Sequence, residues 1–501
     1  MTTVPHFRPD IPFNDLKGLP PSIELETPPV LKACIPARAA LAELHAVTEL
    51  IPNSTILINT IPILEARASS EIENIVTTTD RLFRLAADEQ AQSADPSTKE
   101  ALRYRTALRQ GYDLLISRPV STNLAIDVCT TLRSVETSVR RIPGTTLRNL
   151  VTGEAVYTPP YEEQRLRRLL ANWETFLHAH EPLDPLVRMA VGHYQFEAIH
   201  PFEDGNGRTG RILNLLFLVE QGLLRHPVLS MSGAIIRRRN DYYKLLLDVT
   251  TQQRWEPWIL YMLQVVDETS RWTTAKIRAI RLLIKTTVEY VQSKAPKIYS
   301  RELVDVIFEQ PYCRIENLVR SGIAKRQTAS TYLATLADIG VLSPVQGGRE
   351  KLFIHRALLN LLKSDMHEVI AYGSRRAESN PSASRFPEDL VNRRIDVNQS
   401  GSIDEQLRFA IANTLLIQVS YKGRDRVVEP HDYGLQKGMK RLLAYQLRGT
   451  GDARGRGVTG WRLLDVSKID QCSVMEETFG GSRGASHEHH YVWHTVYARV
   501  P

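Results

Sequence analysis

Apolar residues recur every three to four positions through much of the N-terminal half of the chain. The pattern is clear over residues 30–48 and 63–85, with a break between them at Pro52-Asn53. Residues 101–263 continue as a long helical block with one interruption at residues 141–160, where Pro, Gly, Thr and Val indicate a turn or hairpin. The spacing therefore predicts a mainly α-helical protein.

The C-terminal half changes character twice. Residues 299–362 hold two short helical stretches, a third helix and two extended runs joined by a Gly turn, which is the order of elements in a winged helix. Residues 374–403 are rich in Ser, Arg, Asn and Pro, as in a linker. The last hundred residues alternate short β-type runs with Gly-rich turns. We expect a helical core with a β-hairpin flap, then a winged helix and a small C-terminal β-rich domain.

Composition and charge narrow the class of protein. The 501 residues are 43% hydrophobic and 24% charged, ordinary values for a globular chain. No apolar run reaches the roughly 18–20 residues of a membrane span, and no secretory signal is visible, so we expect a cytoplasmic protein with no membrane partner. The net charge of +7 is compatible with an acidic partner. Four widely spaced cysteines predict reduced thiols, with no disulfide framework and no cysteine-based zinc site: Cys34, Cys129, Cys313 and Cys472.

One stretch, residues 193–214, combines several groups that suit phosphate chemistry. Its glycines, Gly205 and Gly207, flank Asn206 in a short loop before an apolar helix. Such a loop lets backbone N–H groups approach an anion at a helix N-terminus. Arg208 and Arg211 share one face of the first helical turn, and two arginines beside a glycine cradle indicate a polyphosphate.

Two further residues of this stretch could carry the reaction itself. Asp204 lies just before the cradle and could hold a Mg²⁺ ion that bridges phosphate oxygens. His200 lies four residues earlier and could accept a proton from an attacking hydroxyl. We therefore expect a base, a metal ligand and a phosphate cradle within twelve residues.

The string from His200 to Arg211, HPFEDGNGRTGR, resembles the Fic family motif HxFx(D/E)GNGRxxR at every defined position, and the resemblance spans about residues 101–263. Fic proteins mostly transfer AMP from ATP to a hydroxyl of a target protein. The resemblance implies His200 as general base, Asp204 as Mg²⁺ ligand, Phe202 as a core anchor, and a hairpin near residues 148–160 as a flap that binds target backbone. It implies an ATP site made by Gly205, Asn206, Gly207, Arg208, Arg211, Tyr242 and Tyr243.

An inhibitory motif is also similar to the family pattern. Ser69, Glu73 and Asn74 match (S/T)xxxE(G/N), and Ser69 and Glu73 share a helix face. By this resemblance, Glu73 would pair with Arg211 and hold ATP unproductively, so that the resting protein is weakly active. Glu73 could alternatively position water for the removal of AMP.

The remaining segments suggest further partners. Residues 325–328 open the third helix of the winged-helix segment, and Arg349 and Lys351 lie on its wing, so DNA and protein contacts both remain open. The C-terminal segment weakly resembles a WYL-like domain whose basic residues would suit a nucleotide or nucleic acid, with a plain basic barrel as the alternative: Arg424, Arg426 and Lys440. We expect no structural metal at the histidines near the end of the chain, His487, His489, His490 and His494.

The sequence thus predicts an ATP- and Mg²⁺-dependent protein adenylyltransferase of the Fic type that modifies a Ser, Thr or Tyr of a target protein or of itself. The alternatives are a transcription regulator with a nucleotide-sensing Fic unit and DNA as partner, and an enzyme that both adds and removes AMP. Family precedent implies a homodimer. The expected domains are an N-terminal helical domain with the inhibitory helix, a Fic catalytic domain, a winged helix, a linker and a WYL-like domain, at residues 1–100, 101–275, 285–365, 366–403 and 404–501.

Overall fold

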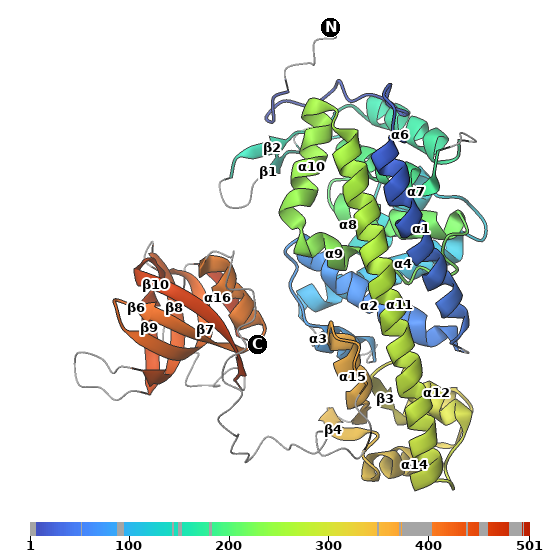
Figure 1. Cartoon of the computed structure of the whole chain (residues 1–501), viewed down its shortest axis with the longest axis vertical. Helices are drawn as coiled ribbons and strands as arrows, with labels where there is room; N and C mark the ends of the chain where they lie inside the picture. Colours follow the sequence, from blue (N-terminus) through green and yellow to red (C-terminus); the bar gives the residue numbers. More distant parts are fainter. Residues whose placement is uncertain are drawn as a thin grey trace. The chain divides into compact units, whose positions relative to one another are not determined.

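The computed structural model divides into two compact units, residues 1–379 and 380–501. It is mainly α-helical in the first unit and β-rich in the second, as the sequence predicts (Figure 1). The structure describes residues 7–51, 53–87, 95–142, 145–148, 153–179, 183–347, 350–369, 372, 403–436, 439–449, 459–479, 493 and 495–500. Arg349, the histidines at 487, 489, 490 and 494, and most of the expected linker lie outside these residues.

Five helices form the N-terminal part of the first unit. Several begin at a side chain that accepts a backbone N–H bond, as Asn53 does from Thr55 and Asp95 from Thr98. The second helix carries the predicted inhibitory residues at its C-terminal end and buries nearly all of its side chains in the core. The helices are α1 (Pro28–Glu49), α2 (Ser54–Ile72), α3 (Thr79–Ala86), α4 (Pro96–Leu114) and α5 (Thr122–Arg133).

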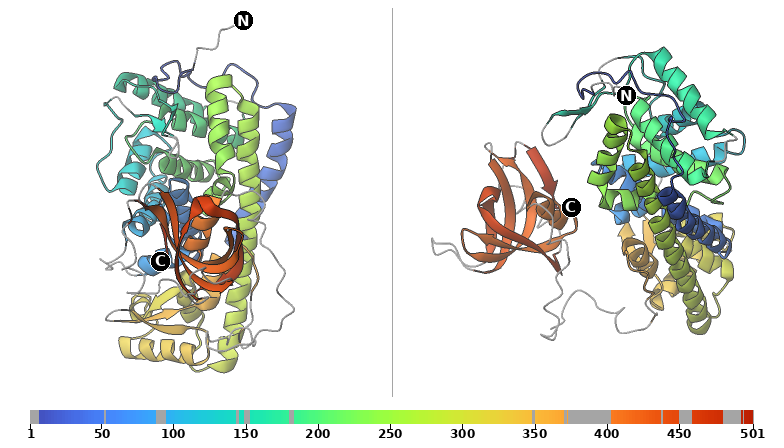
Figure 2. Two further views of the ribbon diagram at one scale, coloured as in Figure 1. Left: turned by 90° about the vertical axis from the view of Figure 1, so that its left-hand side faces the viewer. Right: turned by 45° about the horizontal axis from the view of Figure 1, so that its top comes forward.

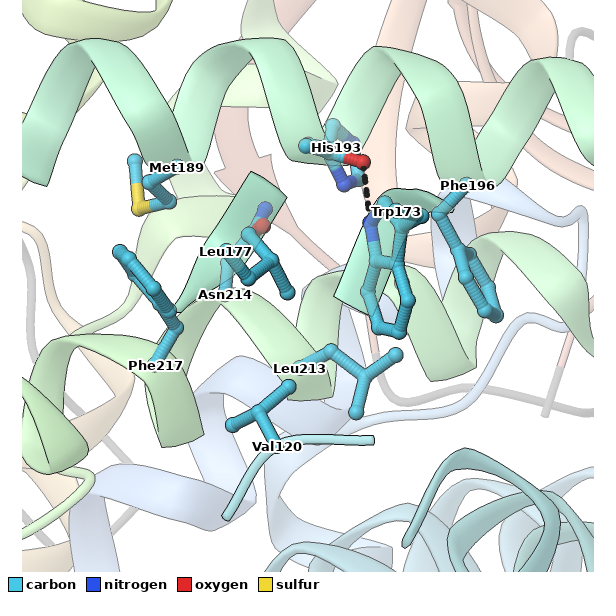
Figure 3. Close-up of a pocket in the computed structure, with 11 residues that line it drawn as sticks. Val120, Trp173, Leu177, Met189, His193, Phe196, Leu213, Asn214 and Phe217 are labelled. Atoms are coloured by element: carbon cyan, nitrogen blue, oxygen red, sulfur yellow. Dashed lines mark hydrogen bonds between the residues drawn. The ribbon is translucent and has the colours of Figure 1, made fainter. Parts of the chain in front are cut away.

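A second group of helices surrounds the predicted motif. Helices α7 and α8 pack against each other and are buried on nearly every face, including polar residues such as Arg188, Arg208 and Arg211. Trp173 of α6 donates its indole N–H to the carbonyl of Gly192 in α7 at 2.9 Å, beside a small apolar cavity (Figure 3). The group comprises α6 (Glu163–Leu177), α7 (Pro185–Ile199), α8 (Asn206–Glu220), α9 (Met231–Arg237) and α10 (Arg239–Gln252).

Helix α11 (Trp255–Lys294) runs as one 40-residue helix through the boundary that we expected at residues 275–285. It packs along α1 and also contacts α7, α12 and α15 (Figure 2). One hydrophobic core therefore extends from Leu19 to Leu362. The segment beyond α11 adds a short strand and a final helix to the three helices and hairpin that we expected: α12 (Arg301–Glu309), β3 (Tyr312–Arg314), α13 (Ile315–Arg320), α14 (Arg326–Asp338), β4 (Ser343–Gly347), β5 (Glu350–Ile354) and α15 (Arg356–Lys363).

The second unit is a six-stranded antiparallel sheet of order β10-β6-β7-β8-β9, with β11 paired to β7. Helix α16 (Ile403–Ala412) packs against this sheet and was not expected from the sequence. Arg426, which we expected to suit a ligand, is buried and donates to Gln446 at 2.8 Å. The strands are β6 (Leu415–Tyr421), β7 (Asp425–Gln436), β8 (Met439–Gly449), β9 (Gly460–Asp465), β10 (Ile469–Thr478) and β11 (Thr495–Arg499).

A proline-rich, polar composition predicts a flexible arm over residues 1–18, but the described part of this arm packs on the rest of the first unit. Residues 7–19 lie against the body of the first unit, and Phe13 donates its backbone N–H to the carbonyl of Thr158 at 2.9 Å. The rings of Phe7 and Phe13 pack on Tyr157. The arm is ordered because its apolar rings and backbone groups find partners on the core, which the proline-rich composition did not reveal.

Two expectations drawn from composition can be compared with the described part of the chain. None of its helices combines the length and the apolar character that crossing a bilayer requires. Its four cysteines are free thiols, and three of them are buried.

Candidate functional site

The predicted motif lies between the end of α7 and the start of α8. Helix α7 ends at Ile199; its C-cap residue His200 has a left-handed backbone at φ 49°, and Gly205 at φ 82° turns the chain into α8. A left-handed turn at Gly205 costs little because glycine has no Cβ. The turn places the imidazole of His200 and the free backbone N–H groups at the start of α8 around one cleft.

The side chain of Asn206 closes this loop. Its Oδ1 accepts from the backbone N–H of Phe202 and its Nδ2 donates to the carbonyl of Phe202, both at 2.8 Å. Phe202 itself is fully buried, as expected. We expected the Asn206 amide to bind phosphate. In the structure this amide holds the loop through both bonds to Phe202. One Nδ2–H and the backbone N–H of Asn206 remain available for an anion.

The cleft has a volume of about 640 Å³ and brings most of the predicted motif together. It is lined by the loop itself, by the flap and by the N-terminal helices. Among its lining residues are Glu73, Glu100, Thr145, Leu147, His200, Asp204, Asn206 and Arg208. A cleft of this size is typical of a small-molecule site.

Arg211 is held by the two predicted inhibitory residues. Its Nη2 lies 2.8 Å from Oε1 of Glu73, and its Nε donates to Oγ of Ser69 at 2.8 Å. The Arg211 side chain is 1% exposed. Burial is the largest single effect and acts against its charge, but the Glu73 carboxylate together with Tyr242, Tyr243 and Glu197 outweighs burial and raises the pKa of Arg211. A Cβ on Gly207 would overlap Oε1 of Glu73, so the Glu73 carboxylate occupies space directly beside the glycine cradle.

Arg208 is also paired, with a residue that sequence reasoning missed. Its Nη1 donates to Oε1 of Glu100 in α4 at 2.7 Å, and its side chain is 4% exposed. Both arginines of the motif are therefore neutralised by carboxylates from the N-terminal helices. Glu100 lies 108 residues away in the sequence, in a helix with many charged residues, so only the fold could single it out.

The surroundings of His200 keep its imidazole neutral. Burial first, and then the charge of Arg140, lower the pKa of its imidazole to about 4. A neutral imidazole at physiological pH can accept a proton from a hydroxyl. Arg140 was not predicted as a site residue; its Nε donates to the carbonyl of His200 at 2.8 Å.

Asp204 fits a magnesium site completed by substrate. Its side chain is 66% exposed, and its nearest cations, Arg133 and Arg208, are 3.9 Å away. Within the described residues, no cluster of three or more metal-binding side chains occurs. Mg²⁺ is commonly held by one or two carboxylates together with substrate phosphates, so one exposed carboxylate at the edge of a phosphate cradle suits it.

The two tyrosines expected near adenine have different environments. Tyr242 is buried and lies 2.8 Å from Nε2 of His193, so it belongs to the core. Tyr243 is 42% exposed and packs beside the guanidinium of Arg239. Arg239 also donates to Oδ1 of Asn74 at 3.0 Å and thereby ties the last predicted inhibitory residue to α10.

The predicted flap is a short hairpin of β1 (Leu147–Arg148) and β2 (Ala155–Tyr157). Its residues 149–152 lie outside the described part of the chain. Residues 145–147 line the same cleft as His200. The site thus combines a neutral imidazole, backbone donors at a helix N-terminus, two buried arginines and an exposed carboxylate, a set suited to transfer of a phosphate-linked group.

Three family models match the chain. Residues 31–113 match the Fic/DOC family N-terminal model, residues 127–218 match the Fic/DOC family model, and residues 283–358 match the C-terminal domain of SoFic-like protein adenylyltransferases. The motif and the predicted inhibitory residues therefore fall inside two matched domains, and most of the segment that we expected to be a winged helix falls in the third.

Curated relatives are named protein adenylyltransferases. A probable protein adenylyltransferase of Aquifex aeolicus is 47% identical over 66 residues, 13% of this chain and 20% of the relative, and protein adenylyltransferase Fic of Drosophila yakuba is 28% identical over 154 residues, 29% and 30%. The chain thus spans less than a third of the length of these relatives. A crystal structure of a Fic family protein from Desulfovibrio desulfuricans aligns with a TM-score of 0.43 at 19% identity, covering 67% of this chain and 98% of that protein.

Proposed function

The chain carries Fic/DOC N-terminal and Fic/DOC domains, and on this premise we propose that it is a protein adenylyltransferase that uses ATP. The observation that carries the proposal is the joint placement of His200 and the α8 N-terminus in one cleft. A neutral imidazole serves as base, and the N–H groups of α8 stabilise the charge on a phosphate.

The transfer needs little covalent help from the protein. A hydroxyl of a target protein, or of the chain itself, gives its proton to His200 as its oxygen bonds to the α-phosphorus of ATP. The bond from that phosphorus to pyrophosphate breaks, and the backbone of Gly205–Gly207 stabilises the charge on the α-phosphate. Arg208 and Arg211 bind the outer phosphates. Mg²⁺ at Asp204 would neutralise charge on the leaving pyrophosphate.

We further propose that Glu73 inhibits the enzyme within the same chain. Arg211 cannot bind a phosphate while Glu73 and Ser69 occupy its guanidinium, with contacts of 2.8 Å to each. ATP bound under these conditions lacks one arginine contact and takes an unproductive position. Removal of the Glu73 carboxylate frees Arg211, and the rate of AMP transfer rises.

The test uses the whole chain with Mg²⁺ and ATP labelled at the α-phosphate. Wild type, Glu73→Gly, Glu73→Gly combined with His200→Ala, and Glu71→Gly as a matched control are incubated with a lysate as target source and assayed by intact-protein mass spectrometry and autoradiography. We expect label with Glu73→Gly, weak label with wild type and Glu71→Gly, and none without His200. Absence of label in every form would refute the proposed activity.

A separate observation supports a second candidate function, DNA binding. Lys325, Arg326, Gln327 and Thr328 are all exposed at the start of α14, as is Lys351 of the adjoining hairpin. Basic and polar residues at the start of such a helix can contact phosphates and bases in the major groove. A fluorescent duplex tests it: binding that weakens with salt, and that Lys325→Gln reduces, would support DNA as a partner, and no binding at low salt would exclude it.

A further inference from the structure

Arg140 lies in the segment between α5 and the flap, and its side chain is not used in the mechanism above. The residue is 4% exposed. Its guanidinium donates to the carbonyls of His200 at 2.8 Å and Ile199 at 3.3 Å, and to the carbonyl of Pro160 beyond the flap. Its backbone N–H donates to the carbonyl of Pro201 at 2.9 Å. Arg140 therefore joins the base of the flap to the His200 turn, with its guanidinium bound before the turn and its backbone N–H bound after it.

Tyr157 of β2 makes a parallel contact. Its hydroxyl donates to the carbonyl of Ala198 at 2.8 Å. The last carbonyls of a helix have no partner within that helix. At the C-terminal end of α7 the carbonyls of Ala198, Ile199 and the C-cap His200 all accept from Arg140 or from Tyr157 of the flap, so the end of α7 and the base of the flap form one hydrogen-bonded body.

The free-energy cost of burying the charged guanidinium of Arg140 is offset by its hydrogen bonds. Within the described residues no carboxylate lies at ion-pairing distance from it, and burial lowers the pKa of its guanidinium. A buried unpaired charge is costly unless it is fully hydrogen-bonded. The carbonyl end of α7, which carries the negative end of the helix dipole, offsets that cost. The planar guanidinium of arginine has several N–H groups and can donate to carbonyls of two separate segments at once, which the single ammonium of lysine does less well.

We infer that Arg140 is a positioning residue that fixes the flap relative to the imidazole of His200, so that a hydroxyl presented by a target strand on the flap arrives in register with the base. This inference rests on the proposed function. It concerns the transfer step and not the binding of ATP, because Arg140 contacts neither the Gly205–Gly207 cradle nor the two motif arginines among the described contacts.

The experiment measures AMP transfer at saturating ATP, and ATP affinity by calorimetry, in the Glu73→Gly chain. Arg140→Met should lower the transfer rate about 100-fold, the scale of a displacement of about 1 Å at a reacting group. Arg140→Lys should retain part of the rate, and ATP affinity should stay within about twofold because the phosphate cradle is untouched. Tyr157→Phe, which removes one hydroxyl, gives a milder variant should Arg140→Met fail to fold.

Arg188 provides the matched control. Like Arg140 it is a buried arginine, but it lies in α7, and it donates to the carbonyls of Leu177 at 3.3 Å and Leu183 at 3.2 Å. It lies twelve residues, or about 18 Å, from His200 along the helix axis. Arg188→Met should lower the melting temperature as Arg140→Met does and leave the transfer rate of the folded protein unchanged.

The outcomes separate the inference from the proposed function. Equal rates for Arg140→Met and its parent, or equal losses in rate for the Arg140 and Arg188 variants, would overturn the positioning role. A loss of ATP affinity as large as the loss of rate would do the same. If the parent transfers no AMP, the proposed function fails, and hydrogen exchange decides the inference: faster exchange at residues 196–202 in Arg140→Met supports it, and unchanged exchange refutes it.

Discussion

The pairing of Arg208 with Glu100 yields a prediction in which stability and ATP affinity change in opposite directions. Glu100→Gln removes a carboxylate 2.7 Å from Arg208 and keeps the shape of the side chain. In the free protein the change leaves a guanidinium that is 4% exposed without its ion pair, the next carboxylate being Asp204 at 3.9 Å. With ATP bound, a phosphate oxygen can take the place of the lost carboxylate.

The magnitude follows from the geometry. A hydrogen bond to a charged group contributes about 1.5–3 kcal/mol, and the Glu100 side chain is 35% exposed, which favours the lower part of that range. We therefore expect Glu100→Gln to lower the free energy of unfolding by about 2 kcal/mol. ATP no longer has to displace the carboxylate, so its affinity should rise between about 3-fold and 30-fold, the upper bound being the full 2 kcal/mol.

Calorimetric titration with ATP and thermal denaturation without it measure the two effects. The control is Glu43→Gln, because Glu43 pairs with Arg278 at the same 2.7 Å on an exposed surface. Such a pair contributes about 0–1 kcal/mol, and its loss should leave ATP affinity unchanged. Weaker ATP binding by Glu100→Gln would refute the reasoning, since it would mean that Glu100 holds Arg208 in its binding position and does not compete with phosphate.

Three further changes test other parts of the structure. Burial raises the pKa of Glu197 to about 7 from 4.5, so the native state keeps a proton that the unfolded chain releases between these two pH values. The free energy of unfolding should therefore fall by up to about 3 kcal/mol as pH rises from 4.5 to about 7. Urea denaturation should show a smaller fall for Glu197→Gln. Tyr242→Phe should lower the free energy of unfolding by about 1–3 kcal/mol because it leaves the buried ring nitrogen of His193 without its hydrogen-bond partner. Tyr243 is exposed, so Tyr243→Phe should not change the melting temperature in thermal denaturation. Phe13→Ala should speed amide exchange at residues 155–158 and leave α8 unchanged, since the Phe13 ring packs on the flap.

The sequence predicts the candidate site residues that lie close together in the chain, and their catalytic roles stay predictions. His200, Asp204 and Arg211 share a string whose spacing follows from a loop that enters a helix, and Ser69 and Glu73 follow from helical periodicity. Local chemistry of this kind is encoded within one or two turns of backbone. The helical class and the β-rich C-terminus likewise follow from local periodicity.

What the sequence did not reveal depends on contacts between distant segments. Glu100 and Arg140 look like ordinary charged residues, and only packing brings them to Arg208 and the His200 carbonyl. Asn206 was assigned by chemistry to phosphate, but its buried position gives it a backbone partner first. The arm at residues 7–19 carries no periodic pattern because its order comes from the surface on which it lies.

Helix α11 is a single rigid element that connects the two ends of the first unit. Its 40 residues span about 60 Å without interruption, so a force that tilts one end also moves the other. One end packs on α7, whose last residue precedes His200, and the other packs on α12, which also touches α2. We therefore expect a displacement of the segment at residues 283–358 to be transmitted to α7, which precedes His200, and to α2, which precedes Glu73, because the continuous helix α11 contains no break that could act as a hinge.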